Sequence, residues 1–462
     1  MRKTALWPLA VLALAASPAV AEPVLKDGFD ALARPLVEGQ YVTGLVIGVI
    51  GKPSEPLVFG YGRVALAGPA RAPDGDTLFE IGSASKVFTS LMLADLVERK
   101  LVSLDDPAAK YLPPSVKVPT WSGKPITLAH LATHSSGLPR MPNNFHPKDP
   151  NDPYADYGAD ALYAFLSSYT LTREPGLTYD YSNLGAGLLG HVVALVNKST
   201  YEAVLTERIA KPLGMASTRL TLSAADRARF AEPHDAGGAA VHEWNFAALA
   251  GAGAIRSTAN DLLRFVRANL GLVPSPLAAA MKLQRERRHD APPLDAIGLG
   301  WHLRDDGRTV WHNGQTAGFH SYVAFDPERK LGVVVLANSA AGVVDELGYQ
   351  VLRALRGETV RPLELKSRVR PVFPLSEAQL DGYTGTYPLM PGFALDIRRD
   401  GDHLVVQATG QPSFPLYAET ATHFYLRVVP AELDFRRDPS GAITDLTLHQ
   451  NGHDLTGPRK PH

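Results

Sequence analysis

The sequence of 462 residues contains no cysteine. This absence excludes disulfide bonds, a thiolate nucleophile, cysteine-ligated zinc and a lipid anchor attached to cysteine. A protein without such cross-links depends on its hydrophobic core for stability, and a chain of this length is long enough to bury one. The length also fits two or three domains.

The sequence also lacks an excess of charge of one sign. It has 46 Lys and Arg against 47 Asp and Glu, a net charge of −1. Without a basic excess, no nucleic acid partner is expected, and without an acidic tract no charged disordered tail is expected. No repeat of solenoid period is present either.

Long apolar runs are absent too, since no segment after the N-terminus offers the roughly 18 apolar residues of a membrane span. The N-terminus itself has Arg2 and Lys3, then an apolar stretch from Leu6 to Ala16, then small residues ending at Ala21. This order is typical of a cleavable signal peptide over residues 1–21. We therefore expect cleavage after Ala21, secretion to a bacterial periplasm, and no transmembrane segment afterwards.

Strand-forming runs lie at both ends of a long region whose middle is helical. Residues 45–50 and 57–61 are β-rich and predict a hairpin, and a second group follows much later in the chain. The sequence therefore predicts an α+β fold in which an antiparallel sheet, flanked by helices, carries an inserted helical subdomain. The later strands are expected at residues 309–312, 321–325 and 331–336, the last two joined by a turn at 326–329.

Helical segments are expected at residues 84–100 and 345–356. The first is apolar on most sides between Val87 and Leu96, which indicates a buried central helix. The second is amphipathic and ends at Gly357. Between them, residues 141–157 are rich in Pro, Asn and Asp and predict a long loop of the kind that often lines a site.

The C-terminal part of the chain has a different pattern. Pro362, Pro371 and Pro374 mark a linker over residues 358–374, and short alternating strands follow. These predict a small all-β, barrel-like domain. The expected organisation is a signal peptide (1–21), a catalytic domain (22–357), the linker (358–374) and the β-domain (375–462), with strands at 394–398, 403–408, 413–417, 423–428, 433–436 and 443–450.

The first candidate chemical motif is Ser83 with Lys86. Residues three apart on a helix face the same side. At the first turn, the backbone N–H of Ser83 also points out of the helix, where it favours a developing oxyanion. A desolvated lysine can lose its proton and activate the hydroxyl. A capping serine with a surface lysine is the commoner explanation of this pattern, but here the lysine opens a buried helix with no acid nearby in sequence.

Two further motifs are weak when taken alone. Tyr181 could relay a proton between nucleophile and leaving group, and the amide of Asn183 could hold a substrate carbonyl. The segment from His312 to Gln315 begins at a strand end. Gly314 would let a substrate lie close along the strand, and the N–H of Gln315 could be a second oxyanion donor.

In this order the three motifs resemble the penicillin-recognising serine hydrolases, and within them the class C β-lactamase group. That group also contains D-Ala-D-Ala carboxypeptidases, D-amino-acid peptidases and esterases. The resemblance covers roughly residues 25–355, and the tail from Pro374 is similar to a lipocalin-like β-domain of some relatives. The segments that carry it are 79–89 (FEIGSASKVFT), 104–107 (LDDP), 126–139 (ITLAHLATHSSGLP) and 322–338.

The resemblance implies a β-lactamase/D,D-peptidase fold and a role for each motif. Ser83 would be the nucleophile, with Lys86 and Tyr181 as the proton-transfer pair. The N–H groups of Ser83 and Gln315 would form the oxyanion hole. The substrate-binding residues would be Asn183, His312, Gly314 and Gln315, and no metal or cofactor is implied.

The function expected from this resemblance is a secreted serine acyl-hydrolase that forms an acyl-enzyme at Ser83. Hydrolysis of a β-lactam amide is the first expectation. Cleavage of peptidoglycan-type D-Ala peptides, as a carboxypeptidase or endopeptidase, is the alternative, together with D-aminopeptidase or esterase activity. A non-catalytic penicillin or cell-wall sensor is disfavoured because Ser83, Lys86 and Tyr181 are all present.

Two details bear on these expectations. Class C members usually have Lys where this chain has His312, and histidine there also resembles certain D,D-peptidases and D-aminopeptidases. Since free imidazole has a pKa of about 6.5, we hypothesise that carboxylate-bearing substrates bind better as pH falls towards 6. His130 and His134 have the four-residue spacing of zinc ligands on a helix, but no partner is evident and no metal is expected.

Overall fold

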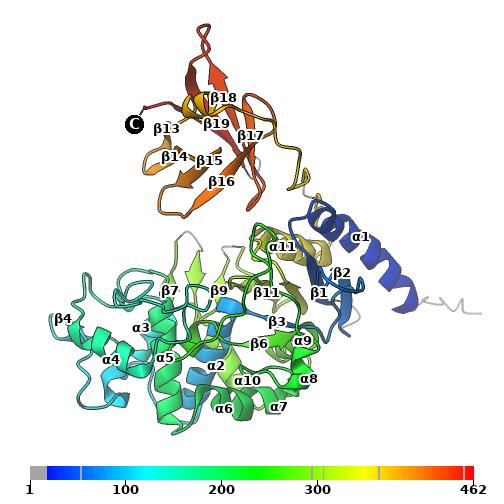
Figure 1. Cartoon of the computed structure of the whole chain (residues 1–462). Helices are drawn as coiled ribbons and strands as arrows, with labels where there is room; N and C mark the ends of the chain where they lie inside the picture. The colour runs from blue at the N-terminus through cyan, green and yellow to red at the C-terminus, as the bar shows by residue number, and fades with distance from the viewer. Residues whose placement is uncertain are drawn as a thin grey trace, which may run out of the picture.

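The computed structural model describes residues 18–51, 55–292, 295–304, 306–362, 365–450 and 453–461. Most of the predicted signal peptide, residues 1–17, lies outside this part. Helix α1 begins at Pro18 and ends at Glu38. In the described ranges, no helix has the length and apolar character needed to span a membrane. Figure 1 shows the N-terminal α+β body and a separate β-domain beyond it.

An eight-stranded sheet forms the centre of the N-terminal body, in the order β2-β1-β12-β11-β10-β9-β8-β7. Leu45 of β1 pairs with Ala337 of β12, so the two ends of the region meet in adjacent antiparallel strands. This confirms the predicted sheet and both hairpins. The strands are β1 (Gly44–Ile50), β2 (Leu57–Gly62), β7 (His289–Asp290), β8 (Ala296–Ile297), β9 (His302–Leu303), β10 (Val310–Gln315), β11 (His320–Asp326) and β12 (Leu331–Ala337).

Helices cover both faces of this sheet. On one face, α1 and α11 (Val343–Leu355) bury Phe29 and Val351 in a core shared with β12. On the other, α9 (Ala259–Asn269) lies so close that a Cβ on Gly48 would be 2.7 Å from Leu263. The strands β1, β11 and β12 are therefore buried along their whole length, which explains the continuous apolar sequence of β1 and β12.

The predicted central helix is α2 (Ser85–Glu98), preceded by a 3-10 turn at Gly82–Ala84. It is buried from Ser85 to Leu96, as the sequence predicted. The expected loop at 141–157 has no helix or strand. The remaining helices are α3 (Leu128–Ala132), α4 (Ala159–Ser168), α5 (Asn183–Val196), α6 (Tyr201–Leu205), the π-helix Thr206–Ala210, α7 (Lys211–Leu213), α8 (Ala224–Arg227) and α10 (Ala278–Gln284), with 3-10 turns at Ala108–Tyr111 and Ala250–Ala252.

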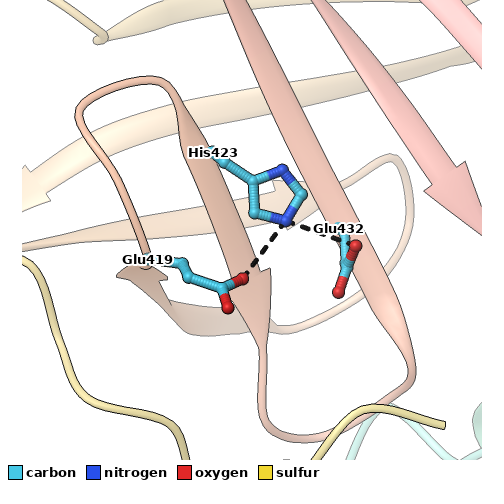
Figure 2. A group of neighbouring side chains, drawn as sticks. All are labelled: Glu419, His423 and Glu432. Atoms are coloured by element: carbon cyan, nitrogen blue, oxygen red, sulfur yellow. Dashed lines mark ion pairs between the residues drawn. The ribbon is translucent and has the colours of Figure 1, made fainter.

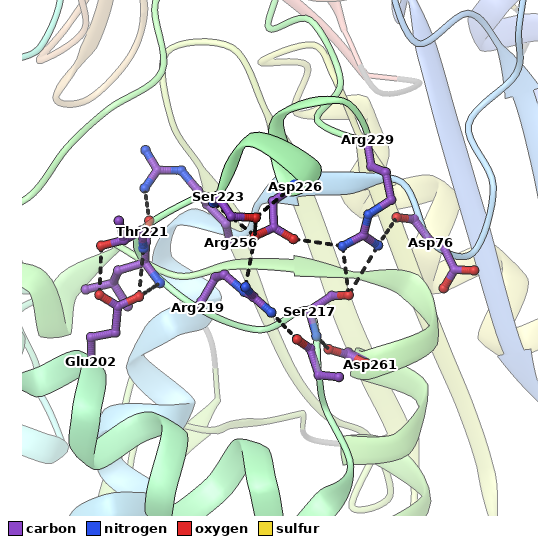
Figure 3. A network of polar contacts seen from close by, with 12 residues as sticks. Asp76, Glu202, Ser217, Arg219, Thr221, Ser223, Asp226, Arg229, Arg256 and Asp261 are labelled. Carbon is purple, nitrogen blue, oxygen red and sulfur yellow. Dashed lines mark hydrogen bonds and ion pairs between the residues drawn. The ribbon is translucent and has the colours of Figure 1, made fainter.

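A short two-stranded sheet leads into the central helix. Strand β3 (Leu78–Glu80) pairs with β6 (Arg256–Thr258), and a two-stranded ribbon of β4 (Thr120–Trp121) and β5 (Lys124–Pro125) lies elsewhere on the body. A polar network beside β6 fixes its position (Figure 3). In that network, Asp226 accepts from Arg219 and Arg229, both at 2.9 Å.

The C-terminal domain is an eight-stranded antiparallel barrel. The barrel closes where Lys460, just after the last strand, meets Thr386 of the first strand, and the backbone groups of the two residues exchange two hydrogen bonds of 2.9 Å. The sequence predicted a barrel-like domain but missed β13 and β20. The elements are α12 (Glu377–Asp381), β13 (Gly385–Met390), β14 (Phe393–Asp400), β15 (His403–Ala408), β16 (Ser413–Ala418), β17 (His423–Leu426), β18 (Ala431–Arg437), β19 (Ile443–Gln450) and β20 (His453–Pro458).

Candidate active site

The turn that carries Ser83 lies directly against strand β10. Gly82 has a φ of +49°, and a Cβ there would be 2.6 Å from the backbone nitrogen of Gln315. A Cβ on Gly314 would lie 1.9 Å from the carbonyl oxygen of Ile81 and 2.8 Å from the Ser83 nitrogen. Glycine is therefore required on both sides of this contact. The close approach puts the backbone N–H groups of Ser83 and Gln315 in one small region.

Lys86 is buried behind Ser83, with 1% of the residue exposed. Its Nζ lies 2.9 Å from Ser83 Oγ and 2.7 Å from the carbonyl oxygen of Ala252. No carboxylate in the described part of the chain pairs with it. Burial, reinforced by the positive charge of Arg140, holds the pKa of Lys86 well below its ordinary value of 10.5. A neutral amine beside Ser83 can accept the proton of the hydroxyl.

Tyr181 lies close to both Lys86 and Ser83. The Lys86 Nζ is 4.8 Å from the centroid of the Tyr181 ring, and His134 stacks on that ring at 4.4 Å. Burial raises the pKa of Tyr181 to about 12, although a hydrogen bond with Ser83 opposes the shift. The phenol is therefore protonated at neutral pH and can donate a hydrogen bond or pass on a proton.

His134 contacts Tyr181 and the backbone beside it, and does not form a zinc-ligand pair with His130. Helix α3 ends at Ala132, so His130 lies in the helix and His134 lies beyond it, with a φ of +54°. The two histidines consequently do not share a helix face, and the assumption of one helix was wrong. Nδ1 of His134 accepts a hydrogen bond of 3.1 Å from the backbone N–H of Ser182. This contact, which the sequence reading missed, fixes the backbone next to Tyr181.

Asn183 is the first residue of α5, and its Nδ2 lies 3.5 Å from the hydroxyl of Tyr154. Tyr154 comes from the loop 141–157, so this loop does contribute to the cleft wall. Its ring lies 5.3 Å from that of Trp244 and 4.5 Å from that of Phe246. No local sequence pattern points to these aromatic side chains, because they come from loops far apart in the chain.

His312 lies behind the cleft wall instead of on it, with 1% of the residue exposed. Its Nδ1 is 2.5 Å from the carbonyl oxygen of Asn313, and its ring is 4.8 Å from that of His302. Burial, with His302 and Lys86 nearby, holds the pKa of His312 well below 6.5. Burial also lowers the pKa of His302 to about 4. This burial disfavours the predicted cationic His312 near pH 6, because an imidazolium would lose its hydration there.

The cleft itself has a volume of about 720 Å³. Of the predicted residues, Ser83, Tyr181, Asn183, Gly314 and Gln315 line it, whereas Lys86 and His312 lie behind its surface. Every described lining residue belongs to the N-terminal body. Lining residues not singled out from the sequence include Arg140, Tyr154, Tyr179, Trp244, Phe246, His302, Trp311, Asn313, Thr316, His320 and Asp345.

A chain of polar contacts runs along one wall of the cleft. Nδ1 of His320 lies 3.0 Å from Oε1 of Gln315, and Nε2 of His320 lies 2.7 Å from Oδ1 of Asp345. Asn313 donates to the other oxygen of Asp345, also at 2.7 Å. Asp345 stands in the first turn of α11, so this network links the end of β10 to that helix.

Among the described residues, one group of side chains, formed by Glu419, His423 and Glu432 of the C-terminal barrel, has the composition of a metal site. Nε2 of His423 is 3.4 Å from Glu419 and 3.3 Å from Glu432 (Figure 2). Arg370 of the linker already binds both carboxylates, at 2.6 and 2.9 Å, and Lys366 binds Glu432 at 2.9 Å. These cations occupy the oxygen atoms that a metal would need.

Comparison with known proteins identifies the family to which the chain belongs. The family model described as Beta-lactamase matches residues 29–357, and a domain of unknown function (DUF3471) matches residues 370–459. The chain belongs to the beta-lactamase family. A D-alanyl-D-alanine-carboxypeptidase/endopeptidase AmpH of Escherichia coli is 31% identical over 338 residues, which cover 70% of this chain and 86% of the relative.

Other members of the family agree with this assignment. A beta-lactamase of Escherichia coli is 30% identical over 400 residues, covering 77% of this chain and 100% of the relative. The solved beta-lactamase/D-alanine carboxypeptidase of Yersinia pestis is similar with a TM-score of 0.65 and 27% identity, covering 74% of this chain and 100% of that one. This chain is accordingly a serine hydrolase of the acyl-transfer type.

Proposed function

We propose that this family member is a secreted hydrolase that opens a β-lactam amide through an acyl-enzyme at Ser83. The observation that carries the proposal is the placement of Lys86, which is buried 2.9 Å from Ser83 Oγ and has no acidic partner among the described residues. A buried lysine of this kind is costly for the fold and is explained by use as a base.

Acylation begins when the neutral amine of Lys86 takes the proton of the Ser83 hydroxyl. Ser83 Oγ forms a bond to the carbonyl carbon, and the oxyanion is held by the N–H groups of Ser83 and Gln315. The C–N bond then breaks, and the proton passes through the phenol of Tyr181 to the leaving nitrogen. In a β-lactam that nitrogen stays tethered to the acyl group. Water cleaves the ester in a second step that uses the same proton-transfer groups.

Cleavage of a D-Ala peptide is the second candidate, because it uses the same acylation steps. The relative named as a D-alanyl-D-alanine-carboxypeptidase/endopeptidase supports it. The histidine at position 312 gives further support to this alternative and to D-aminopeptidase or esterase activity, since a permanent cation is missing there. The candidates differ in how fast water removes the acyl group and in which leaving group is accepted.

Secretion to the periplasm and the domain boundaries belong to the same proposal. They rest on the N-terminal pattern of Arg2, Lys3, the apolar stretch and Ala21, and on the linker at 358–374. Mass determination of the exported protein would test the first point, since cleavage after Ala21 predicts Glu22 as the new N-terminus.

The proposal as a whole is tested by whole-protein mass spectrometry after mixing the enzyme with benzylpenicillin, beside a nitrocefin assay. A transient adduct with rapid colour change supports β-lactam hydrolysis. A long-lived adduct on Ser83 with little turnover supports the peptidase alternative instead. An adduct that persists in the Ser83→Ala variant, or none with any amide or ester tried, would refute the acyl-enzyme at Ser83.

A further inference from the structure

Arg140 is the one described residue of the cleft lining that carries a permanent positive charge. Its side chain is exposed, and within the described ranges its guanidinium forms no hydrogen bond or ion pair. The acidic lining residue, Asp345, does not compensate this charge, because it is already paired with His320 and Asn313, both at 2.7 Å. The N–H groups of Arg140 are therefore free to bind a ligand in the cleft.

The position of Arg140 is fixed by its contacts with the start of α5. Its backbone carbonyl oxygen accepts the N–H of Asn183 at 3.0 Å, and the carbonyl oxygen of Pro139 accepts the hydroxyl of Ser182 at 2.7 Å. The guanidinium carbon lies 5.1 Å from the ring centroid of Tyr181, so an aromatic face supports the side chain at the cleft wall. The cation therefore lies beside two residues of the proposed site, Tyr181 and Asn183.

The other basic groups near the nucleophile do not supply such a charge. Burial, to which the charge of Arg140 adds, holds the pKa of Lys86 well below 10.5. Burial also holds the pKa of His312 well below 6.5 and lowers that of His302 to about 4. An anionic substrate at neutral pH therefore finds no cation at position 312, where class C members usually have lysine.

A second guanidinium, that of Arg304, lies behind the cleft wall. Its guanidinium carbon is 3.9 Å from the ring centroid of Tyr349 and 5.2 Å from that of Trp311. Trp311 lines the cleft, whereas Arg304 is not among the lining residues. A substrate in the cleft therefore contacts the indole of Trp311 instead of the guanidinium behind it.

We propose that Arg140 is a specificity-determining residue that binds a carboxylate of the substrate and so supplies the permanent cation that position 312 lacks. A guanidinium presents a planar pair of N–H donors that matches the two oxygens of a carboxylate. The proposal deepens the proposed function and rests on it for the substrate class, since benzylpenicillin and D-Ala-D-Ala peptides both bear a carboxylate. The carboxylate belongs either to the leaving group or to the acyl part of the substrate.

Three peptides that share one scissile bond distinguish these two sources. Acetyl-D-Ala-D-Ala has its carboxylate on the leaving group, its C-terminal amide is uncharged, and succinyl-D-Ala-D-Ala amide has its carboxylate on the acyl part. We expect kcat/KM to be about tenfold higher for at least one of the two acids than for the uncharged amide, the lower end of what a hydrogen bond to a charged group contributes. The acid that shows the gain identifies the source, and no gain for either acid would overturn the proposal.

Variants at two arginines assign the gain to its residue. Arg140→Gln removes the charge and should reduce the acid-to-amide ratio of kcat/KM to about one, whereas Arg140→Lys keeps the charge and should retain part of the ratio. The rate with the uncharged amide reports separately any effect of Arg140 on Lys86, because that substrate has no carboxylate.

Arg304→Gln is the matched control, because it removes the same charge from behind Trp311, and it should leave the acid-to-amide ratio unchanged. A ratio that survives Arg140→Gln would overturn the proposal. A ratio that is lost in Arg304→Gln but not in Arg140→Gln would assign the carboxylate to Arg304 and would overturn it as well.

A binding measurement separates this proposal from the acyl-enzyme mechanism. Calorimetry with the Ser83→Ala variant gives the Kd of the three peptides without turnover. Tighter binding of an acid than of the amide, lost when Arg140→Gln is added, supports the carboxylate site even if the wild type forms no adduct. That combination would count against the proposed function alone. Equal affinity for all three peptides would overturn the carboxylate site while leaving the acyl-enzyme intact.

Discussion

The cleft and the barrel treat the same kinds of side chain in opposite ways. In the cleft, Lys86 has no acidic partner among the described residues, and His312 is buried with its pKa well below 6.5. On the barrel, His423 lies 2.7 Å from Asp434, and His449 contacts both Asp434 and Asp454. These barrel histidines have carboxylate partners near the surface, whereas Lys86 and His312 are buried without one among the described residues. His320, which lines the cleft, is the intermediate case, since it is buried but paired with Asp345.

Buried unpaired groups and surface ion pairs have different consequences for stability and for proton affinity. Burial without a partner costs stability and changes proton affinity, which is useful for chemistry. Surface pairs contribute little stability each and leave the titration of a group closer to its ordinary range. The cleft therefore has the electrostatics of a catalytic site, whereas the described histidine pairs of the barrel are of the surface kind.

The largest expected effect is at Lys86. Lys86→Met keeps the length of the buried side chain and removes the base, so acylation should slow by about 10³-fold, the range of general-base catalysis. The rate of Ser83 adduct formation measures this. In the wild type, the same rate should fall as pH decreases, because protonation of Lys86 removes its lone pair. If the Lys86→Met enzyme acylates within about tenfold of the wild-type rate, Lys86 is not the general base, and its burial has no catalytic explanation.

The second effect concerns the stability of the folded protein and is expected at Glu80, which is buried but also has an ion-pair partner. It lies 3.3 Å from Arg256, yet burial raises its pKa to about 7 from 4.5. The folded protein then binds the Glu80 proton more tightly than the unfolded chain does. The stabilisation that this proton gives to the folded state is full below pH 4.5 and is lost as pH rises through about 7. The loss is up to roughly 3 kcal/mol.

Urea unfolding between pH 5 and pH 8 measures this loss. Glu80→Gln should remove most of the pH dependence that comes from this residue, because the amide does not titrate. An identical pH dependence in the wild type and the variant would mean that the pair with Arg256 keeps Glu80 ionised throughout. Glu80 would then belong with the paired groups of the barrel.

Sequence reasoning found the parts of this site that follow chain order and missed those that the tertiary fold assembles. Ser83 and Lys86 share a helix turn, and Gly314 and Gln315 share a strand, so their relation was visible locally. Asp345, His320 and Trp244 come from separate elements, and only strand pairing and helix packing bring them to the cleft. The burial of His312, which the sequence did not predict, has the same origin, since His302 from another strand packs against its ring.

In the barrel, the sequence predicted the strands with clear alternation. It missed β13, where Pro388 interrupts the pattern, and β20, where four of the six residues are exposed and only Leu455 and Gly457 are more buried. The first and last strands of a barrel are held in place mainly by the contacts that close the barrel, here the bridge between Thr386 and Lys460. Their own sequences therefore carry a weaker signal.

A smaller effect is expected at the linker. Arg370 is 10% exposed, binds Glu419 and Glu432, and stacks 3.9 Å from the ring centroid of Tyr425. Arg370→Met should lower stability by about 1–3 kcal/mol, since two partly buried carboxylates lose a partner. Acylation should not change. Arg398→Gln, on an exposed strand position, is the control, with an expected change below about 0.5 kcal/mol. A loss of acylation in the Arg370→Met variant would show that barrel and cleft are coupled.

The smallest effect is expected from the group that the sequence singled out as a pH sensor. If His312 stays neutral, the KM for a carboxylate substrate should change by less than about twofold between pH 8 and pH 6, because a pKa well below 6.5 leaves no charge to gain in that range. The amide of the same substrate corrects for other titrations, since its own charge is constant. A KM that falls severalfold for the acid alone, and no longer does so in His312→Gln, would require an imidazolium in the cleft. His312 would then have to be reached by solvent, and burial would no longer separate His312 from the histidines of the barrel.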